Sequence, residues 1–160
     1  MPSIPIHLPH FRICATSLSS GYIRIHAVAK KKMAACPDCN TPSSRVHSYY
    51  LRKPRDLPFS DQRVCLQLRV RRFRCLLDRC RRVTFAERFP DFLPFRARRT
   101  NRFTSALRHI AFALGGKAGA RLACKLAMPT SGDTLIRIIL ATTLPTCNKP
   151  YADILCCRCR

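Results

Sequence analysis

Acidic residues are scarce in this chain of 160 residues. Eight Asp and Glu stand against 30 Lys and Arg, which gives a formal net charge of +22. So large an excess of one sign implies a polyanionic partner, because the compact state would otherwise repel itself unless a metal offset part of the charge. Nucleic acid is the first candidate for that partner.

The sequence also lacks a long apolar run and an export signal. Its most apolar stretch, 135–144, is interrupted by Arg137 and falls short of the roughly 20 residues needed to cross a bilayer. The first 20 residues contain three prolines and no basic start followed by an apolar run. We therefore predict a cytoplasmic protein without membrane contacts. The length leaves room for one or two compact domains and makes a large enzyme unexpected.

Cysteine, in contrast, is abundant, with 11 residues. An odd count, uneven spacings and no export signal favour reduced thiols over a disulfide scaffold. Two pairs stand out, Cys36-Pro37-Asp38-Cys39 and the pair Cys75 and Cys80. Four thiolates satisfy the tetrahedral coordination of a structural zinc ion, so we predict one zinc ion held by Cys36, Cys39, Cys75 and Cys80. Unrelated buried or redox thiols are the alternative.

Other cysteine and histidine residues have simpler interpretations. Cys65 lies in the middle of an expected strand and is interpreted as a packed or surface thiol. His47 could replace a cysteine or touch a phosphate, but four thiolates already close the site. A cluster near the end of the chain has no second pair facing it and is assigned to a disordered tail. Its members are Cys156, Cys157 and Cys159.

Strands are expected around and between the two cysteine pairs. Alternation predicts a short strand from Tyr22, a strand over 45–52 and a longer one over 63–73, with a turn-forming segment over 54–61. In the longest strand, apolar residues from Val64 to Val70 alternate with Arg, Cys and Gln, so one face packs and the other is basic. Because a two-stranded hairpin is marginal alone, zinc would stabilise this module.

The second half of the chain changes character. Arginines and two prolines mark 90–99 as a basic linker, either solvated or in contact with phosphate. Apolar residues then follow a helical period from about Thr100 to Leu114, where Gly115-Gly116 ends the helix. A second helix ends at Met128-Pro129, and Ser131 is the expected N-cap of a third.

Three short helices with these breaks indicate a helix-turn-helix. A helical hairpin that only packs, or that mediates self-association, is the alternative. In the usual docking, the start of the third helix lies near the major groove, which makes Thr130, Thr134 and Arg137 candidate contacts.

Several motifs resemble the ISL-three family of bacterial insertion-sequence transposases. The zinc-finger motifs are Cys-Pro-Asp-Cys from Cys36, Arg-Val-His-Ser-Tyr-Tyr from Arg45, Asp-Leu-Pro from Asp56, Arg-Val-Arg-Arg-Phe-Arg-Cys up to Cys75, and Phe-Ala-Glu-Arg from Phe85. The helix-turn-helix motifs are Leu-Gly-Gly-Lys-Ala-Gly-Ala-Arg-Leu-Ala from Leu114 and Ser-Gly-Asp-Thr-Leu-Ile-Arg from Ser131. The resemblance covers roughly 22–144. It implies that two modules bind the terminal inverted repeats of a mobile element that moves by cut-and-join transposition.

The chain also departs from that family. Its members continue into a large RNase-H-like domain, whose Asp, Asp and Glu residues hold two magnesium ions for phosphodiester chemistry. The eight carboxylates here are scattered through the binding modules, so we expect no magnesium site and no strand-transfer activity. The ending 146–160 no longer follows the family, as after a frameshift or a premature stop. Ser60 and Asp61 stand where a hairpin glycine is expected.

The expected fold is a small α+β protein, with a zinc-ribbon-like β module followed by a three-helix module. The expected segments are an irregular leader over 1–21, a zinc-finger domain over 22–89, a basic linker over 90–99, a helix-turn-helix domain over 100–144 and a disordered tail over 145–160. The residues expected to contact DNA are Arg69, Arg71, Arg72, Arg98, Arg99, Thr130, Thr134 and Arg137.

The expected function is that of a truncated transposase in the bacterial cytoplasm, associated with the nucleoid and without chemistry of its own. Its partners would be double-stranded DNA at the element ends and a full-length transposase that it represses by competition, with no small-molecule substrate. Three alternatives stay open: a complete transposase if frameshifting restores the catalytic domain, a zinc-ribbon adaptor for RNA or protein, and a decayed product that never accumulates.

Overall fold

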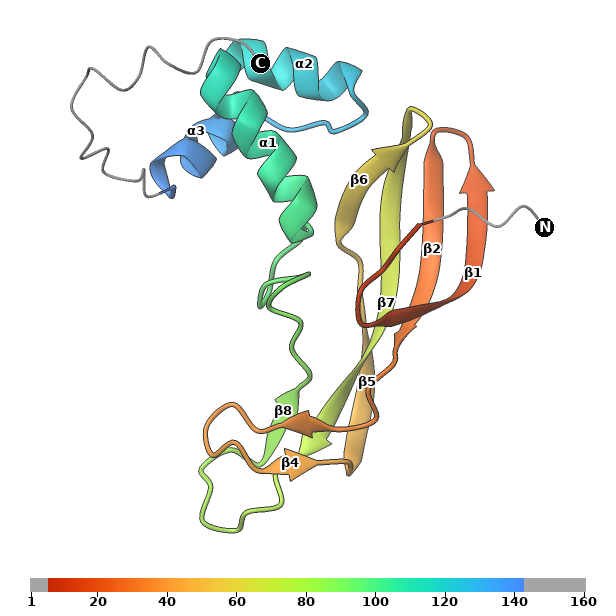
Figure 1. Cartoon of the computed structure of the whole chain (residues 1–160), viewed down its shortest axis with the longest axis vertical. Helices are drawn as coiled ribbons and strands as arrows, with labels where there is room; N and C mark the ends of the chain where they lie inside the picture. The colour runs from red at the N-terminus through yellow and green to blue at the C-terminus, as the bar shows by residue number, and fades with distance from the viewer. Residues whose placement is uncertain (1–5, 143–160) are drawn as a thin grey trace, which may run out of the picture.

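The computed structural model describes residues 6–142. Within them, eight strands precede three helices (Figure 1), which confirms the small α+β class. The elements are β1 (Phe11–Ser19), β2 (Tyr22–Ala29), β3 (Ala34–Ala35), β4 (Pro42–Ser43), β5 (Val46–Arg52), β6 (Arg55–Phe59), β7 (Gln62–Arg74), β8 (Thr84–Ala86), α1 (Asn101–Leu114), α2 (Lys117–Lys125) and α3 (Gly132–Leu140). The expected tail, with its cluster of Cys156, Cys157 and Cys159, and the first five residues of the leader lie outside the described residues.

The long strand β7 is the centre of a six-stranded sheet. Strand β2 pairs parallel with its first half, from Tyr22 opposite Arg63 to Val28 opposite Arg69. On the other edge of β7, β6 and then β5 pair antiparallel with it. Strand β8 pairs antiparallel with the last residues of β7 on the edge opposite β5, which is the edge of β2. Figure 1 shows β6, β7, β2 and β1 side by side. Strand β7 therefore belongs both to the sheet and, through its last residues, to the metal module.

The leader is not irregular throughout. The prediction of an irregular segment over 1–21 is wrong for Phe11–Ser19, which forms β1 and pairs antiparallel with β2. Gly21 adopts φ 76° in the turn between them, a conformation that glycine adopts without steric cost. Most of β1 is exposed on both faces. Without a buried face, its sequence carries no alternation to reveal a strand.

One face of the sheet forms the main core, as the alternation in β7 predicts. Val64, Leu66, Leu68 and Val70 are at most 2% exposed. They pack with buried residues of β2 and with Leu8, Phe11, Phe89, Phe92 and Leu93. Phe92 and Leu93 belong to the segment expected as a basic linker. Part of that segment therefore packs on the sheet core, so the segment is not a fully solvated connection.

The segment expected only as a turn between two strands contains strand β6. Its true turn is the pair Ser60 and Asp61, with φ 47° and 58°, which joins Phe59 to Gln62 opposite it. Two successive residues at positive φ are typical of a type I′ hairpin, where Gly or Asn is usual and Asp is accepted. The hairpin therefore forms without the glycine that the sequence lacks at this position.

The three helices lie where the sequence predicts them and Ser131 is the expected cap, but α2 ends at Lys125 and not at Met128-Pro129. Thr100 accepts a hydrogen bond from the Phe103 amide at the start of α1, and Ser131 accepts one from the Thr134 amide at the start of α3. Gly115, at φ 69°, ends α1. The helices share a second core built on Phe103, Leu107, Ala111, Ala123, Met128 and Leu135. No helix among residues 6–142 is long and apolar enough to span a membrane.

A buried carboxylate fastens the helices to the sheet. Asp56 of β6 is 1% exposed and accepts hydrogen bonds from Thr100 Oγ1 and Arg102 Nε, each at 2.7 Å, and from Arg102 Nη2. The neighbouring Arg55 donates to the Pro129 carbonyl at 2.8 Å and lies over the Phe103 ring. These contacts hold α1 against β6, on the side of the sheet where Figure 1 shows the helices.

Candidate metal centre and nucleic-acid interface

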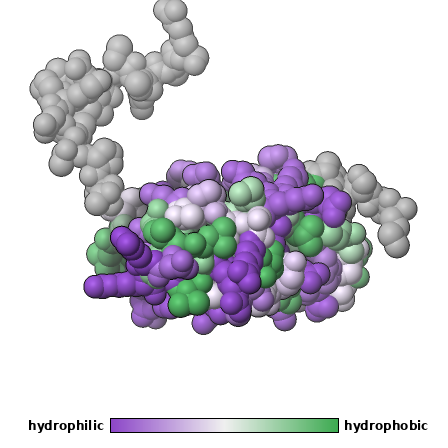
Figure 2. Space-filling model, turned by 90° about the horizontal axis from the view of Figure 1, so that it is seen from below, coloured by the Kyte–Doolittle hydropathy of each residue, from purple (hydrophilic) through white to green (hydrophobic). Residues whose placement is uncertain are grey.

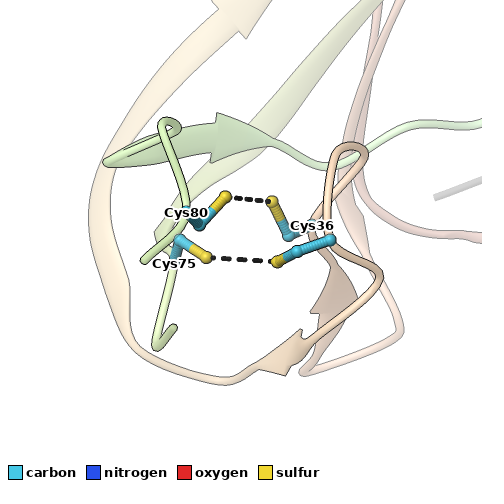
Figure 3. A group of neighbouring side chains, drawn as sticks. Cys36, Cys75 and Cys80 are labelled. Atoms are coloured by element: carbon cyan, nitrogen blue, oxygen red, sulfur yellow. Dashed lines mark hydrogen bonds between the residues drawn. The ribbon is translucent and has the colours of Figure 1, made fainter. Parts of the chain in front are cut away.

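Two loops bring the four predicted cysteines together at one end of the molecule. Cys36 and Cys39 lie on the turn between β3 and β4, where the Cys36 amide donates to the Thr41 carbonyl and Asn40 adopts φ 57°. Cys75 and Cys80 lie on the loop that connects β7 to β8, which is closed by the Cys75 amide donating to the Val83 carbonyl. Figure 3 shows the thiols of the two loops facing one another.

The sulfur positions fit one zinc ion. All four Sγ atoms lie within 4.8 Å of one another, with Cys36 Sγ 3.9 Å from Cys80 Sγ and Cys39 Sγ 3.5 Å from Cys75 Sγ. Tetrahedral coordination at a Zn–S distance of about 2.3 Å places sulfurs about 3.8 Å apart. Cys36 is fully buried, and four thiolates leave no coordination position for a substrate. The protein therefore binds one structural zinc ion through Cys36, Cys39, Cys75 and Cys80.

The thiols of this group do not titrate alike. Hydrogen bonds with the side chain and backbone of Thr41 lower the pKa of Cys39 to about 6. A hydrogen bond from the Leu77 backbone favours the Cys75 thiolate, but burial and hydrogen bonds with the other thiols raise the pKa of Cys75 to about 12. Without metal the group thus retains protons. A divalent cation favours all four thiolates, so zinc binding displaces protons.

Further contacts couple the two loops. Arg82 Nε donates to Asp38 Oδ2 at 2.7 Å, which joins the second loop to the first, and the Arg82 amide donates to Cys80 Sγ at 3.4 Å. Phe73 and Phe85 pack beside the thiols and form a third buried cluster. Amide and guanidinium donors offset the negative charge that four thiolates retain around one zinc ion.

The outer surface of this end is partly apolar. Figure 2 looks onto it and shows hydrophobic residues among hydrophilic ones. Leu76 and Leu77, between the second pair of ligands, are 50% and 46% exposed. Two other candidate ligands lie outside the thiol group. Cys65 is half-buried in the middle of β7, and His47 is exposed on β5 with Nδ1 3.1 Å from Ser48 Oγ.

A four-thiolate site between a short hairpin and a β–loop–β unit is the arrangement of a zinc ribbon. Residues 32–76 match the family model for the zinc-finger of transposase IS204/IS1001/IS1096/IS1165. The metal module is similar to a transposase zinc-finger. The match covers 45 of the 160 residues and includes Cys36, Cys39 and Cys75, whereas Cys80 follows it. No curated protein and no solved structure matches the chain.

The match confirms the zinc-finger part of the resemblance and supports a transposase-related, DNA-binding role. It does not extend to the three helices or to a catalytic domain. The recognition of DNA by α3, the inverted repeats as target and the absence of strand-transfer activity stay predictions.

The arginines that the sequence groups on β7 do not share a surface. Arg69 is exposed and lies over the Tyr49 ring, 4.1 Å from its centroid. Arg72 lines a cleft of about 440 Å³ on the other side of the strand, together with Tyr50 and Arg88. Because side chains alternate along a strand, positions an odd number of residues apart point to opposite faces. One DNA molecule cannot lie flat against both.

The Arg71 side chain is engaged in contacts within the protein, near the zinc-finger end. Its side chain is 14% exposed. Its guanidinium lies 3.5 Å from Glu87 and donates to the carbonyls of Ala29 and Lys31. These contacts tie β7 to the end of β2, just before the first zinc-binding turn. Arg71 thus has a structural role that its place in the sequence does not reveal.

The remaining candidate DNA contacts lie on the linker and the helices. Arg98 is exposed, whereas Arg99 is half-buried, and burial together with the charge of Arg55 lowers the pKa of Arg99. On the helices, Thr130 is half-buried, and the Thr134 hydroxyl lies 2.9 Å from Ser131 Oγ within the cap of α3. Arg137 is exposed on α3, so its guanidinium is available to a ligand.

Sequence reasoning missed the residues that orient the helices. Asp56 was counted among scattered carboxylates, and Arg55 and Arg102 were not singled out. No local pattern marks them, since their partners lie more than 40 residues away. The one available signal was an acidic residue in a chain that has very few.

Proposed function

We propose that this protein binds double-stranded DNA at the terminal inverted repeats of an insertion sequence. The observation that carries the proposal is the transposase-type zinc-finger with its complete set of four thiolates, in a chain of net charge +22. Zinc-fingers of this kind position a protein on DNA, and a large positive charge supplies the sequence-independent part of the affinity through release of counterions.

Helix α3 is proposed to enter the major groove. Its start is capped by Ser131, and Arg137 presents an exposed guanidinium in its last turn. An arginine can donate two hydrogen bonds to a guanine edge, which discriminates between base pairs by about 1–3 kcal/mol. The exposed linker arginine Arg98 is assigned to phosphate contacts, which hold the protein on the duplex without reading its sequence.

The hydrogen bonds of Asp56 support these separate roles of the helices and the rest of the protein. It fixes α1, and through the shared helical core α3, against the sheet that carries the zinc-finger. Two contact regions held at a constant separation select DNA in which both parts of the site are correctly spaced. A fixed separation also saves the entropy that two freely linked modules would lose on binding.

The test measures binding of the zinc-loaded protein to a duplex with the inverted repeat that flanks its own coding sequence, by fluorescence anisotropy. A duplex of the same composition in scrambled order is the reference. We expect tighter binding to the repeat, and we expect Arg137→Ala to weaken that binding by about 5- to 150-fold. Arg108→Ala, which removes an exposed arginine from α1, is the charge-matched control. Equal affinity for both duplexes would refute the proposal.

A protein that occupies element ends without joining strands would also repress an intact transposase of the same element. Overproduction of the zinc-loaded chain is expected to lower the transposition frequency of a marked element. The Arg137→Ala variant, at the same protein level, should restore most of it. An unchanged frequency with the wild-type chain would refute repression but not repeat binding.

A further inference from the structure

The sheet has a second face that the proposed duplex contacts leave unused. The core covers the face of Val64, Leu66 and Leu68. The opposite face presents the alternate residues of β7 and those paired with them on β2. None of these residues is buried: Tyr22, Arg24, His26, Val28, Arg63, Cys65, Gln67 and Arg69. We call this surface the open face.

The open face is positively charged and has no acidic counterpart on its own strands. Strands β1, β2, β5 and β7 contain eight arginines and no Asp or Glu. Four of these arginines belong to the open face by their strand register: Arg12, Arg24, Arg63 and Arg69. An array of guanidinium groups without carboxylates is complementary to a phosphate backbone.

Aromatic rings accompany two of these arginines. The Arg63 guanidinium lies over the Tyr22 ring, 5.5 Å from its centroid, and donates to the Tyr22 hydroxyl at 2.9 Å. Arg69 lies over the Tyr49 ring in the same manner. Tyr22 and Tyr49 are 42% and 52% exposed. Tyrosine rings and arginine planes are the groups on which proteins stack unpaired bases.

Around the second of these pairs the open face is hollowed. A depression of about 400 Å³ is lined by the apolar side chains of Val28 and Leu51, by Tyr49 and Arg69, and by His26 and Gln67. Its volume lies in the usual range of small-ligand sites. A lining that combines apolar side chains with hydrogen-bonding groups suits a flat heteroaromatic ring, whose faces are apolar and whose edge carries donors and acceptors.

We propose that the open face binds single-stranded DNA, with one base stacked on Tyr22 and another held in the hollow against Tyr49. A single strand fits better than a duplex, because in a duplex the faces of the bases are stacked on each other and cannot reach an aromatic ring or a hollow. The paired stretch from Tyr22 to Val28 is about 20 Å long at about 3.3 Å per residue. This inference does not rest on the proposed repeat recognition, since the two use different surfaces.

The test uses the full zinc-loaded chain and three fluorescent probes of about 12 nucleotides or base pairs: oligothymidylate, oligouridylate and a mixed-sequence duplex. The double variant Tyr22→Ala, Tyr49→Ala is expected to lose about 5- to 100-fold in affinity for oligothymidylate, as loss of base stacking does. Its affinity for the duplex should change less than about twofold. Arg98→Ala is the matched control with the opposite pattern, because the exposed Arg98 is assigned to duplex phosphates and lies outside the open face.

A second variant guards against a folding defect in the first. Leu51→Glu adds a carboxylate at the hollow, and Leu51 is already 49% exposed, so the fold tolerates it. We expect it to weaken oligothymidylate binding by about tenfold or more, with wild-type zinc content. Because the chain has no Trp, the quenching of Tyr fluorescence by the bases that the wild type shows and the double variant lacks reports stacking on Tyr22 and Tyr49.

Three outcomes would overturn the proposal. The first is wild-type affinity of both the double variant and Leu51→Glu for oligothymidylate. The second is equal weakening of duplex and single-strand binding by either variant. The third is tighter binding of oligouridylate than of oligothymidylate, which would assign the open face to RNA.

Discussion

Asp56 should be the most sensitive single carboxylate in the described part of the chain. It is buried, and Asp56→Asn keeps one oxygen acceptor while it turns an amide donor toward the donors of Arg102 and Thr100. One charge-assisted hydrogen bond from Arg102 is lost and the other becomes a bond to a neutral acceptor, where a charge-assisted bond is worth about 1.5–3 kcal/mol. Arg102 remains 38% exposed, so water recovers part of that loss. The expected decrease in the free energy of unfolding is about 2–4 kcal/mol.

The assay is urea unfolding of the zinc-saturated protein, followed by circular dichroism at the helix band. Asp61→Asn provides the control, because Asp61 is exposed in the next turn and its replacement should change stability by less than about 0.5 kcal/mol. Arg102→Gln completes a double-mutant cycle. If the reasoning holds, the coupling between positions 56 and 102 is about 1–3 kcal/mol. An Asp56→Asn variant as stable as the control would refute the claim that Asp56 holds the helices against the sheet.

Three further predictions concern the metal, a buried acid and a helix contact. Cobalt substitution should show thiolate-to-cobalt absorption that Cys75→Ser loses, with metal affinity falling as the pH is lowered and the thiols protonate; absorption unchanged by Cys75→Ser would contradict the site. Burial raises the pKa of Glu87 against the opposing effect of Arg71. The stabilising contribution of Glu87 is therefore present at low pH and is lost as the pH rises through this raised pKa. Urea unfolding should therefore show Glu87→Gln gaining stability relative to wild type as the pH rises above about 4.5, and a pH-independent difference would argue against it. Gly119→Ala places a methyl carbon 2.8 Å from Leu135 Cδ1, and thermal unfolding should report a loss of about 1–3 kcal/mol.

Local patterns predicted most elements of the fold correctly. The helical period, the glycine stop and the capping residue Ser131 identify the helices, because each signal lies within or next to the element that it defines. Alternation identified the covered face of β7 for the same reason. β1 was missed since it buries almost nothing along its length.

Non-local features were beyond such patterns. The parallel pairing of β2 with β7 brings Tyr22 beside Arg63 across 41 positions of sequence, and no turn signal encodes it. The acceptors of Arg71 and the donors to Asp56 are equally distant. Their roles in holding the zinc-finger and the helices therefore emerge only from the packed structure.

The sequence by itself determined the zinc ligands, the helices and the sign of the partner's charge. Paired thiols, helical periodicity and net charge are properties of residue type and spacing that survive in any arrangement of the elements. Only the tertiary structure decided which arginines work together. It placed Arg69 on the open face, Arg72 in a cleft on the opposite side and Arg71 inside, because strand alternation and long-range pairing, and not proximity in sequence, set the neighbours of a side chain.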